Sequence, residues 1–143
     1  MDTPLARVTR RAMRNGDPGH KNVPVPLLSL EEFFEGNDEV GSIGCNLTSE
    51  PGPGEFYDLL RNIRLKLEVS DIRIQITCVD RPGEDWPFSD TIWFVTTAEP
   101  ERVRDWFPEH LAPDEIWEGW NRGVTYDPCS IPAGQRVIAA WYD

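Results

Sequence analysis

The sequence predicts a single α+β domain in which a four-stranded sheet carries helices on one face. Stretches in which apolar and polar residues alternate, typical of strands, are interspersed with stretches whose apolar residues lie three and four positions apart, typical of helices. Such a succession along the chain indicates a layered fold of α and β elements. The length of 143 residues is enough for one hydrophobic core without support from disulfides or a metal.

The first segment differs in charge from the rest of the chain. Residues 1–24 contain five basic and two acidic side chains, whereas residues 25–143 contain nine basic and 23 acidic ones. Glycine and proline at positions 16–19 end any helix that begins near Leu5. The sequence therefore predicts a basic N-terminal tail, residues 1–24, followed by an acidic domain, residues 25–143. Removing the tail is expected to leave the stability of the domain nearly unchanged.

A short helix is predicted at the start of the acidic domain. Ser29 and Glu32 fit a capping box, in which the serine hydroxyl accepts a hydrogen bond from the backbone N–H of Glu32 while the glutamate side chain reaches back. The helix is expected to run through Phe34 and to end at Gly36.

The first strand and the first long helix are expected next. Ser42–Thr48 alternates between apolar and polar side chains, and a Pro-Gly-Pro-Gly turn follows it. From Glu55 to Leu67 the apolar residues recur at helical spacing, which predicts a helix with one buried face.

The second half of the chain supplies three more strands and one helix. Asp71–Val79 alternates strictly, as a strand buried on one face does. Thr91–Thr97 is apolar on both faces, as a central strand requires. A helix is expected from Pro100, because proline is tolerated in a first helical turn, and Arg136–Tyr142 is the last predicted strand.

The order β-α-β-β-α-β, preceded by the short helix, resembles that of the ferredoxin-like sandwich. The resemblance implies that the first and third strands are central in the sheet. It is a resemblance of topology, and it carries no functional residue over to this chain. Another α+β sheet with helices on one face would give the same order of elements.

Composition excludes several classes of function. A net charge of −11 and a pI near 4.6 argue against a nucleic-acid partner. No stretch approaches the roughly 18 consecutive apolar residues of a membrane-spanning helix, so no membrane association is expected. Three cysteines are too few for a disulfide scaffold. Because the N-terminal segment lacks the apolar core of a secretory signal, a cytoplasmic location is predicted.

No cofactor and no metal site are predicted. The cysteines and the two histidines are dispersed, without the spacing of a zinc site. Gly41–Gly44 leads into a predicted strand, whereas a phosphate-binding loop must open a helix.

The cysteines are the simplest candidate nucleophiles. Cys45 and Cys78 fall in register with the buried faces of predicted strands, so both are expected to be buried and slow to react. Cys129 lies in a proline-flanked loop and is expected to react readily. A Cys129–His110 pair is the catalytic alternative, since a thiol nucleophile needs a base.

Loop 80–90 is the first candidate binding segment. It is longer than the roughly two to five residues that commonly join neighbouring antiparallel strands, and long loops are often functional. Its candidate binding residues are Asp85, Trp86 and Asp90. One alternative is a solvated acidic loop pinned to the body by Trp86 and Phe88, and another is a site for a hard cation such as Ca²⁺.

Segment 114–123 is the second candidate. Trp117 and Trp120 flank Glu118, and Arg122 follows as a side chain able to pair with a carboxylate. Tryptophan is a favoured anchor of interfaces, and this chain has six, so some are expected to stay partly exposed. Trp93, on a predicted sheet face, completes the set of candidate binding residues. Burial in the core is the alternative for each tryptophan.

Three hypotheses for the function remain after these exclusions. The first is a non-catalytic binding or interaction protein, an inhibitor- or immunity-like partner of a basic protein, because the negative charge would steer such a partner. The second is a ligand-binding or dimerising module that uses an open sheet face, with a small molecule or a second copy as its partner. The third is a small enzyme with a pocket near loop 80–90 and segment 114–123, which the lack of a recognisable nucleophile–base pattern disfavours.

Overall fold

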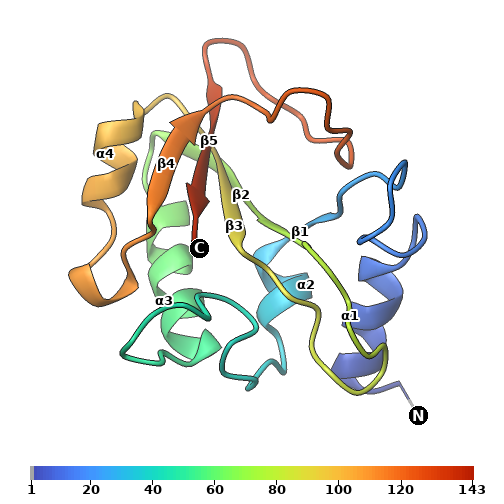
Figure 1. Cartoon of the computed structure of the whole chain (residues 1–143). Coiled ribbons are helices and arrows are strands. Elements are labelled where there is room, and N and C mark those ends of the chain that lie inside the picture. The colour runs from blue at the N-terminus through green and yellow to red at the C-terminus, as the bar shows by residue number, and fades with distance from the viewer. Residues whose placement is uncertain (1) are drawn as a thin grey trace.

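The computed structural model describes residues 2–143 and shows one antiparallel sheet with helices packed on it (Figure 1). Within these residues there are four α-helices, one short 3₁₀ helix and five strands. In chain order they are α1 (Pro4–Ala12), β1 (Leu27–Leu28), α2 (Leu30–Phe34), α3 (Pro53–Arg64), β2 (Val69–Gln75), β3 (Thr91–Thr96), α4 (Pro100–Asp105), η1 (Glu109–Leu111), β4 (Glu115–Glu118) and β5 (Arg136–Trp141).

The predicted α+β single domain is confirmed, but the ferredoxin-like arrangement is not. The sheet has five strands in the order β1-β2-β3-β5-β4, rather than four, and every neighbouring pair is antiparallel. In the ferredoxin-like sandwich another strand separates the two parallel strands of each β-α-β unit, so antiparallel pairing alone would fit it, and the difference lies in the number and order of the strands. Strand β3 is central and buried at every position, as the apolar pattern of Thr91–Thr97 predicts.

The strand predicted at Ser42–Thr48 is absent, and the segment is a loop with one bridge, between Ile43 and Ser89. Gly44 explains the difference. Its φ of +65° lies in the left-handed region, which interrupts an extended chain. A Cβ built at Gly44 would lie 2.6 Å from the Phe56 ring, so the close approach of the α3 side chain also requires glycine.

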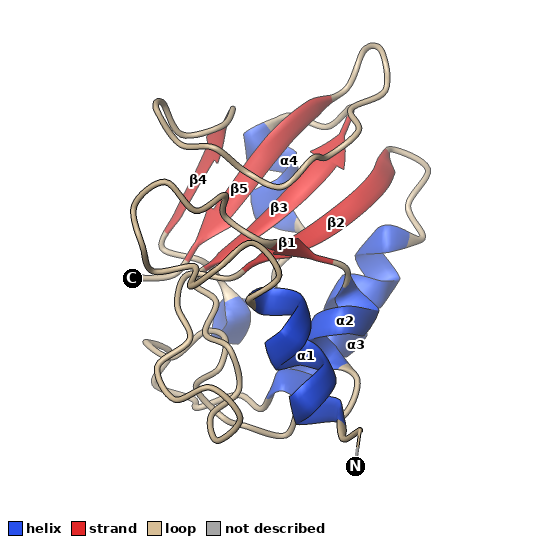
Figure 2. Ribbon diagram, turned by 90° about the vertical axis from the view of Figure 1, so that its right-hand side faces the viewer, coloured by secondary structure: helices blue, strands red, loops and turns tan. Residues whose placement is uncertain are grey.

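The sheet has a different cover on each face. The helices lie on one face, where the larger core joins residues of α2, α3 and the strands, including Phe33, Phe56 and Phe94 (Figures 1 and 2). On the other face a smaller core is centred on Trp93 and Val95, with residues of the chain between β4 and β5 packed over it. That second face was expected to be open, but Trp93 is fully buried on it.

The N-terminal segment, predicted as a separate tail, packs against the domain in the structure. Val8 and Ala12 of α1 are buried in the larger core together with Phe33 of α2. The helix begins with Thr3 as its N-cap and Pro4 in its first turn, both of which favour a helix start. The capping box predicted for Ser29 and Glu32 is present in α2.

None of the helices in residues 2–143 is long and apolar enough to cross a membrane.

Candidate functional site

The outer edge of β1 is closed by side chains and by neighbouring backbone. The Leu27 N–H donates to Asp127 Oδ2 at 3.1 Å, and the Leu27 carbonyl accepts from Arg11 Nη2 at 3.0 Å. Two residues earlier, the Val25 N–H donates to the Thr125 carbonyl at 2.9 Å. Every outward backbone group named here therefore has a partner, and no further strand can be added at this edge.

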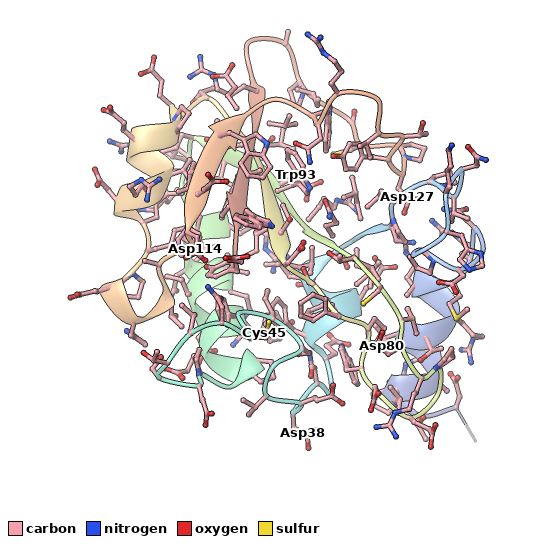
Figure 3. All side chains as sticks on the ribbon, in the orientation of Figure 1. Asp38, Cys45, Asp80, Trp93, Asp114 and Asp127 are labelled. Atoms are coloured by element: carbon pink, nitrogen blue, oxygen red, sulfur yellow. The ribbon has the colours of Figure 1, made fainter. Side chains whose placement is uncertain are left out.

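The Asp127 carboxylate holds this closure together. Its side chain is only 5% exposed, and it accepts hydrogen bonds from Arg11, from Asn15 and from the Leu27 N–H. Arg11 and Asn15 come from α1 and the residues just after it, so the network also fixes the N-terminal segment to the rest of the domain (Figure 3).

The opposite edge of the sheet, at β4, is open. Strand β4 is last in the strand order, and Figure 2 shows it at the rim of the sheet. The Gly119 N–H donates to the Val137 carbonyl at 2.9 Å, which sets the phase of the β4–β5 ladder. Because an antiparallel ladder alternates, the N–H and C=O groups of Ile116 and Glu118 point away from β5. We call this row of outward groups the β4 edge; within residues 2–143 no strand pairs with it.

The side chains of β4 alternate between the two faces. Ile116 packs against the core on the helix side, and Trp117 packs against the smaller core on the other side. Glu115 and Glu118 are exposed at the two ends of the strand. Glu118 shares the helix side with Ile116 and lies 3.7 Å from Arg136 of β5.

An aromatic cluster lies on the face opposite the helices. Its members are Trp93, Trp117, Trp120 and Tyr126. Trp93 is at the centre: its ring centroid is 4.6 Å from that of Trp120, 5.5 Å from that of Tyr126 and 6.4 Å from that of Trp117. Its indole N–H donates to Gln75 Oε1 at 2.9 Å. Trp93 (labelled in Figure 3) is therefore a packed core residue, whereas the side chains of Trp117, Trp120 and Tyr126 are partly exposed.

The structure brings three of the predicted site residues together on one face of the sheet. Trp93, Trp117 and Trp120 form the aromatic cluster, whereas Glu118 follows Trp117 on β4 with its side chain on the helix side. Arg122 is exposed in the loop that follows. Loop 80–90 approaches segment 114–123 at its Asp90 end, where the Asp90 carbonyl accepts from the Tyr142 N–H and the neighbouring Trp141 carbonyl accepts from the Asp114 N–H. Asp80, at the other end of the loop, lies apart from Asp114 (Figure 3).

Loop 80–90 is pinned to the body of the protein. Trp86 is 7% exposed, and its indole N–H donates to the Phe33 carbonyl at 2.9 Å, so it is not available as an interface anchor. Asp85 pairs with Arg81 inside the loop. Asp90 accepts hydrogen bonds from the hydroxyls of Thr77 and Thr91. This geometry agrees with the alternative in which Trp86 anchors a solvated acidic loop.

Two residues of the open edge were missed from the sequence. Glu115 was noted only as part of segment 114–123, and Trp141 only as part of the last strand. In the structure the two are cross-strand partners on β4 and β5. A four-residue strand is too short for its alternation to be recognised in isolation. The sequence pattern therefore does not indicate that Glu115 and Trp141 are cross-strand partners.

The pocket that His110 lines also contains Ser49, whose hydroxyl donates to the His110 carbonyl rather than to the imidazole, and Cys129 is not among its lining residues. His110 Nε2 lies 3.3 Å from Glu55 Oε1 near the start of α3, on the helix side, whereas Cys129 packs against the aromatic cluster. The predicted alternative of a Cys129–His110 pair is therefore wrong. A pocket of about 250 Å³ beside the cluster is lined by Trp120, Val124, Tyr126, Asp127 and Cys129. Within residues 2–143, no group of three or more His, Cys, Asp or Glu side chains is placed to hold a metal ion.

The structure reverses the expected order of reactivity for Cys45 and Cys129 and leaves Cys78 among the slower thiols. Cys45 is exposed, because the strand expected to bury it is a loop, while Cys78 and Cys129 are partly buried. Burial raises the pKa of the Cys78 and Cys129 thiols, and Asp80 adds to the rise at Cys78. We expect iodoacetamide near neutral pH to modify Cys45 first, since the thiolate is the reactive form. Peptide mapping over time measures the order, and faster labelling of Cys129 would contradict the placement of both loops.

The chain matches one family model over nearly its whole length. The model is described as the uncharacterized protein YfbO family, and the match covers residues 3–141. A relative from Escherichia coli (strain K12), named "Uncharacterized protein YfbO", is 44% identical over 141 residues, which cover 99% of this chain and 99% of the relative. No solved structure matches the chain.

Proposed function

We propose that this chain, which belongs to the YfbO family, is a non-catalytic binding protein whose β4 edge accepts an extended, basic segment of a partner protein. The partner segment would lie beside β4 as a sixth strand and pair with the outward N–H and C=O groups of Ile116 and Glu118. This mode of recognition takes its affinity from backbone hydrogen bonds and its selectivity from the side chains that alternate along the added strand.

The main support for this proposal is that the β1 edge of the sheet is closed whereas the β4 edge is open. At β1, Asp127 and Arg11 bond the outward groups of Leu27, which is a common way of preventing unwanted strand pairing. At β4 the corresponding groups have no such cover within residues 2–143. An edge left open in a chain that closes its other edge fits a role in binding.

The charge around β4 favours a basic partner. Asp114, Glu115 and Glu118 are exposed along the strand and its approach, and the whole chain carries a net charge of −11. The positive charge of Arg136 offsets the negative charge of the Glu118 carboxylate. An acidic edge raises the association rate of a basic segment and repels an acidic one.

A second copy of the chain fits the edge less well. Antiparallel pairing of β4 with itself around residues 116–118 sets Glu118 opposite or diagonal to Asp114 or Glu118 of the other copy. Like charges in these cross-strand positions are destabilising. The acidic side chains therefore favour a different partner over self-association.

A selection from a random peptide library tests the proposal. We expect the peptides that bind the protein to be extended and net basic. Glu118→Pro is the informative variant, because proline removes the outward N–H of residue 118 and is tolerated on an edge strand. Glu118→Ala is its matched control, since it removes the same carboxylate and keeps the N–H. Binding should survive Glu118→Ala with a slower association rate and be lost in Glu118→Pro.

Hydrogen exchange shows where the peptides bind. On saturation, the amides of Ile116 and Glu118 should exchange more slowly, because each then donates to the added strand. Equal binding to Glu118→Pro and Glu118→Ala, or selected peptides without basic character, would contradict the proposal.

A further inference from the structure

At the β4 edge, on the face of the aromatic cluster, one carboxylate lies between two tryptophans. Glu115 and Trp117 are two residues apart on β4, so their side chains leave the same face of the strand. Trp141 of β5 is the direct cross-strand partner of Glu115. Side chains of such a pair are neighbours, with Cβ atoms about 4.5–5.5 Å apart. The Glu115 carboxylate is thus bordered by one indole along its strand and by another across it.

The three side chains are accessible in different degrees. Glu115 is exposed, whereas Trp117 and Trp141 are partly buried. The inner part of Trp117 is held by its edge-to-face contact with Trp93, at an interplanar angle of 83°. Trp117 is therefore held by the smaller core, and the exposed parts of both indoles lie on the same face of the sheet as the Glu115 carboxylate.

Glu115 has no cation partner within residues 2–143, unlike Glu118, which lies 3.7 Å from Arg136. The two faces of the β4 edge therefore differ in electrostatics. The face of Glu115 presents a free carboxylate with aromatic surface on both sides. The face of Glu118 presents a carboxylate already close to a guanidinium, which disfavours a second cation there.

A carboxylate bordered by indole rings is the environment that a guanidinium prefers. Arginine can donate two hydrogen bonds to one carboxylate and can at the same time lie flat on an aromatic ring. Attraction between a cation and an indole face adds to the ion pair. Lysine offers a compact, strongly hydrated charge instead, and it gains less from the flat ring surface.

We infer that the segment accepted at the β4 edge places an arginine on the face of the aromatic cluster, with its guanidinium on Glu115 and against Trp117 and Trp141. This inference rests on the proposed function and specifies which side chain of the partner segment the β4 edge recognises. An added strand lies about 4.8 Å from β4, and a long side chain on it reaches the opposite residue and the diagonal ones. The alternate residues of the segment face Ile116 and Glu118 and are apolar or uncharged.

Three defined peptides test the inference. The first is a capped peptide of alternating valine and arginine, so that all its arginines leave one face of the strand. In the second, citrulline replaces arginine and keeps the shape of the side chain without the charge. A third peptide carries lysine at these positions. We expect the arginine peptide to bind the wild-type protein about tenfold more tightly than the citrulline peptide, with the lysine peptide between them.

Two matched variants show which face of the β4 edge recognises the arginine. Glu115→Gln should remove most of the preference for arginine over citrulline. Glu118→Gln makes the same chemical change on the other face and should preserve the preference. Titration by calorimetry gives the affinities, and slowed exchange of the Ile116 amide confirms that the peptide occupies the edge.

The outcomes separate the two proposals. Equal affinity for the arginine and citrulline peptides, or loss of the preference in Glu118→Gln rather than Glu115→Gln, overturns the inference. If the library yields edge binders without arginine, the proposed function stands and the inference falls. If no peptide from the library protects the Ile116 and Glu118 amides, the proposed function falls and the inference falls with it.

Discussion

Replacing Asp127 by alanine should lower the free energy of unfolding by about 3–5 kcal/mol. The Asp127 side chain is 5% exposed and accepts hydrogen bonds from Arg11, Asn15 and the Leu27 N–H. Its removal leaves the Arg11 guanidinium, itself only 13% exposed, without this anion and leaves the Leu27 N–H without an acceptor. Urea unfolding followed by tryptophan fluorescence measures the loss.

A surface ion pair provides the control for this change. Asp85→Ala removes a carboxylate that pairs with Arg81, whose side chain is 65% exposed. Because exposed pairs contribute about 0–1 kcal/mol, this variant should unfold almost as the wild type does. Asp127→Ala should also open the β1 edge and promote association between copies, which light scattering detects. A loss in Asp127→Ala no larger than in Asp85→Ala would show that the network does not hold the edge.

The Asp127 network also explains why the N-terminal segment could not be placed from the sequence. Arg11 and Asn15 lie more than a hundred positions before Asp127, and nothing in the local pattern of either segment indicates the other. α1 ends at Ala12, with Met13 as its C-cap, before the glycine and proline residues at 16–19 are reached. They form a turn that returns the chain to the domain, so a local break did not separate the segment from the core.

The elements that the sequence predicted correctly are those with strong local signals. The capping box of Ser29 and Glu32 needs only four residues, and it is present. Thr91–Thr96 is apolar on both faces and is the buried central strand. The failures depend on information that lies elsewhere in the chain. Ser42–Thr48 alternates as a strand does, but the ring of Phe56 and the positive φ of Gly44 keep it in a loop.

The candidate site was predicted in part for the same reason. The local sequence makes Trp86 and Trp117 candidate binding residues, since acidic residues lie close to each of them. Their different environments follow from contacts across the fold: Trp86 donates to the Phe33 carbonyl of α2, whereas Trp117 lies on an edge strand. The open edge itself is a property of strand order. No pattern within Glu115–Glu118 indicates that β4 is the last strand of the sheet.

The aromatic cluster leads to the second large effect, because Trp93 supports the surface beside the β4 edge. Trp93 is fully buried, and the rings of Trp117, Trp120 and Tyr126 all pack against it. Trp93→Ala should lower the free energy of unfolding by about 3–5 kcal/mol, since a buried tryptophan leaves a large cavity. It also leaves the Gln75 amide oxygen without its indole donor.

Trp106→Ala is the matched control, because this tryptophan is only partly buried and packs on the other face of the sheet. It should lower the free energy of unfolding, measured by chemical denaturation, by less than Trp93→Ala does. In Trp93→Ala the amides of β4 should also exchange faster under native conditions, since Trp117 loses the ring against which it packs. Any peptide that binds through Trp117 should then bind more weakly, even where the protein remains folded. Equal losses of stability in the two variants, with unchanged exchange in β4, would mean that Trp93 fills space in the sheet without supporting its open edge.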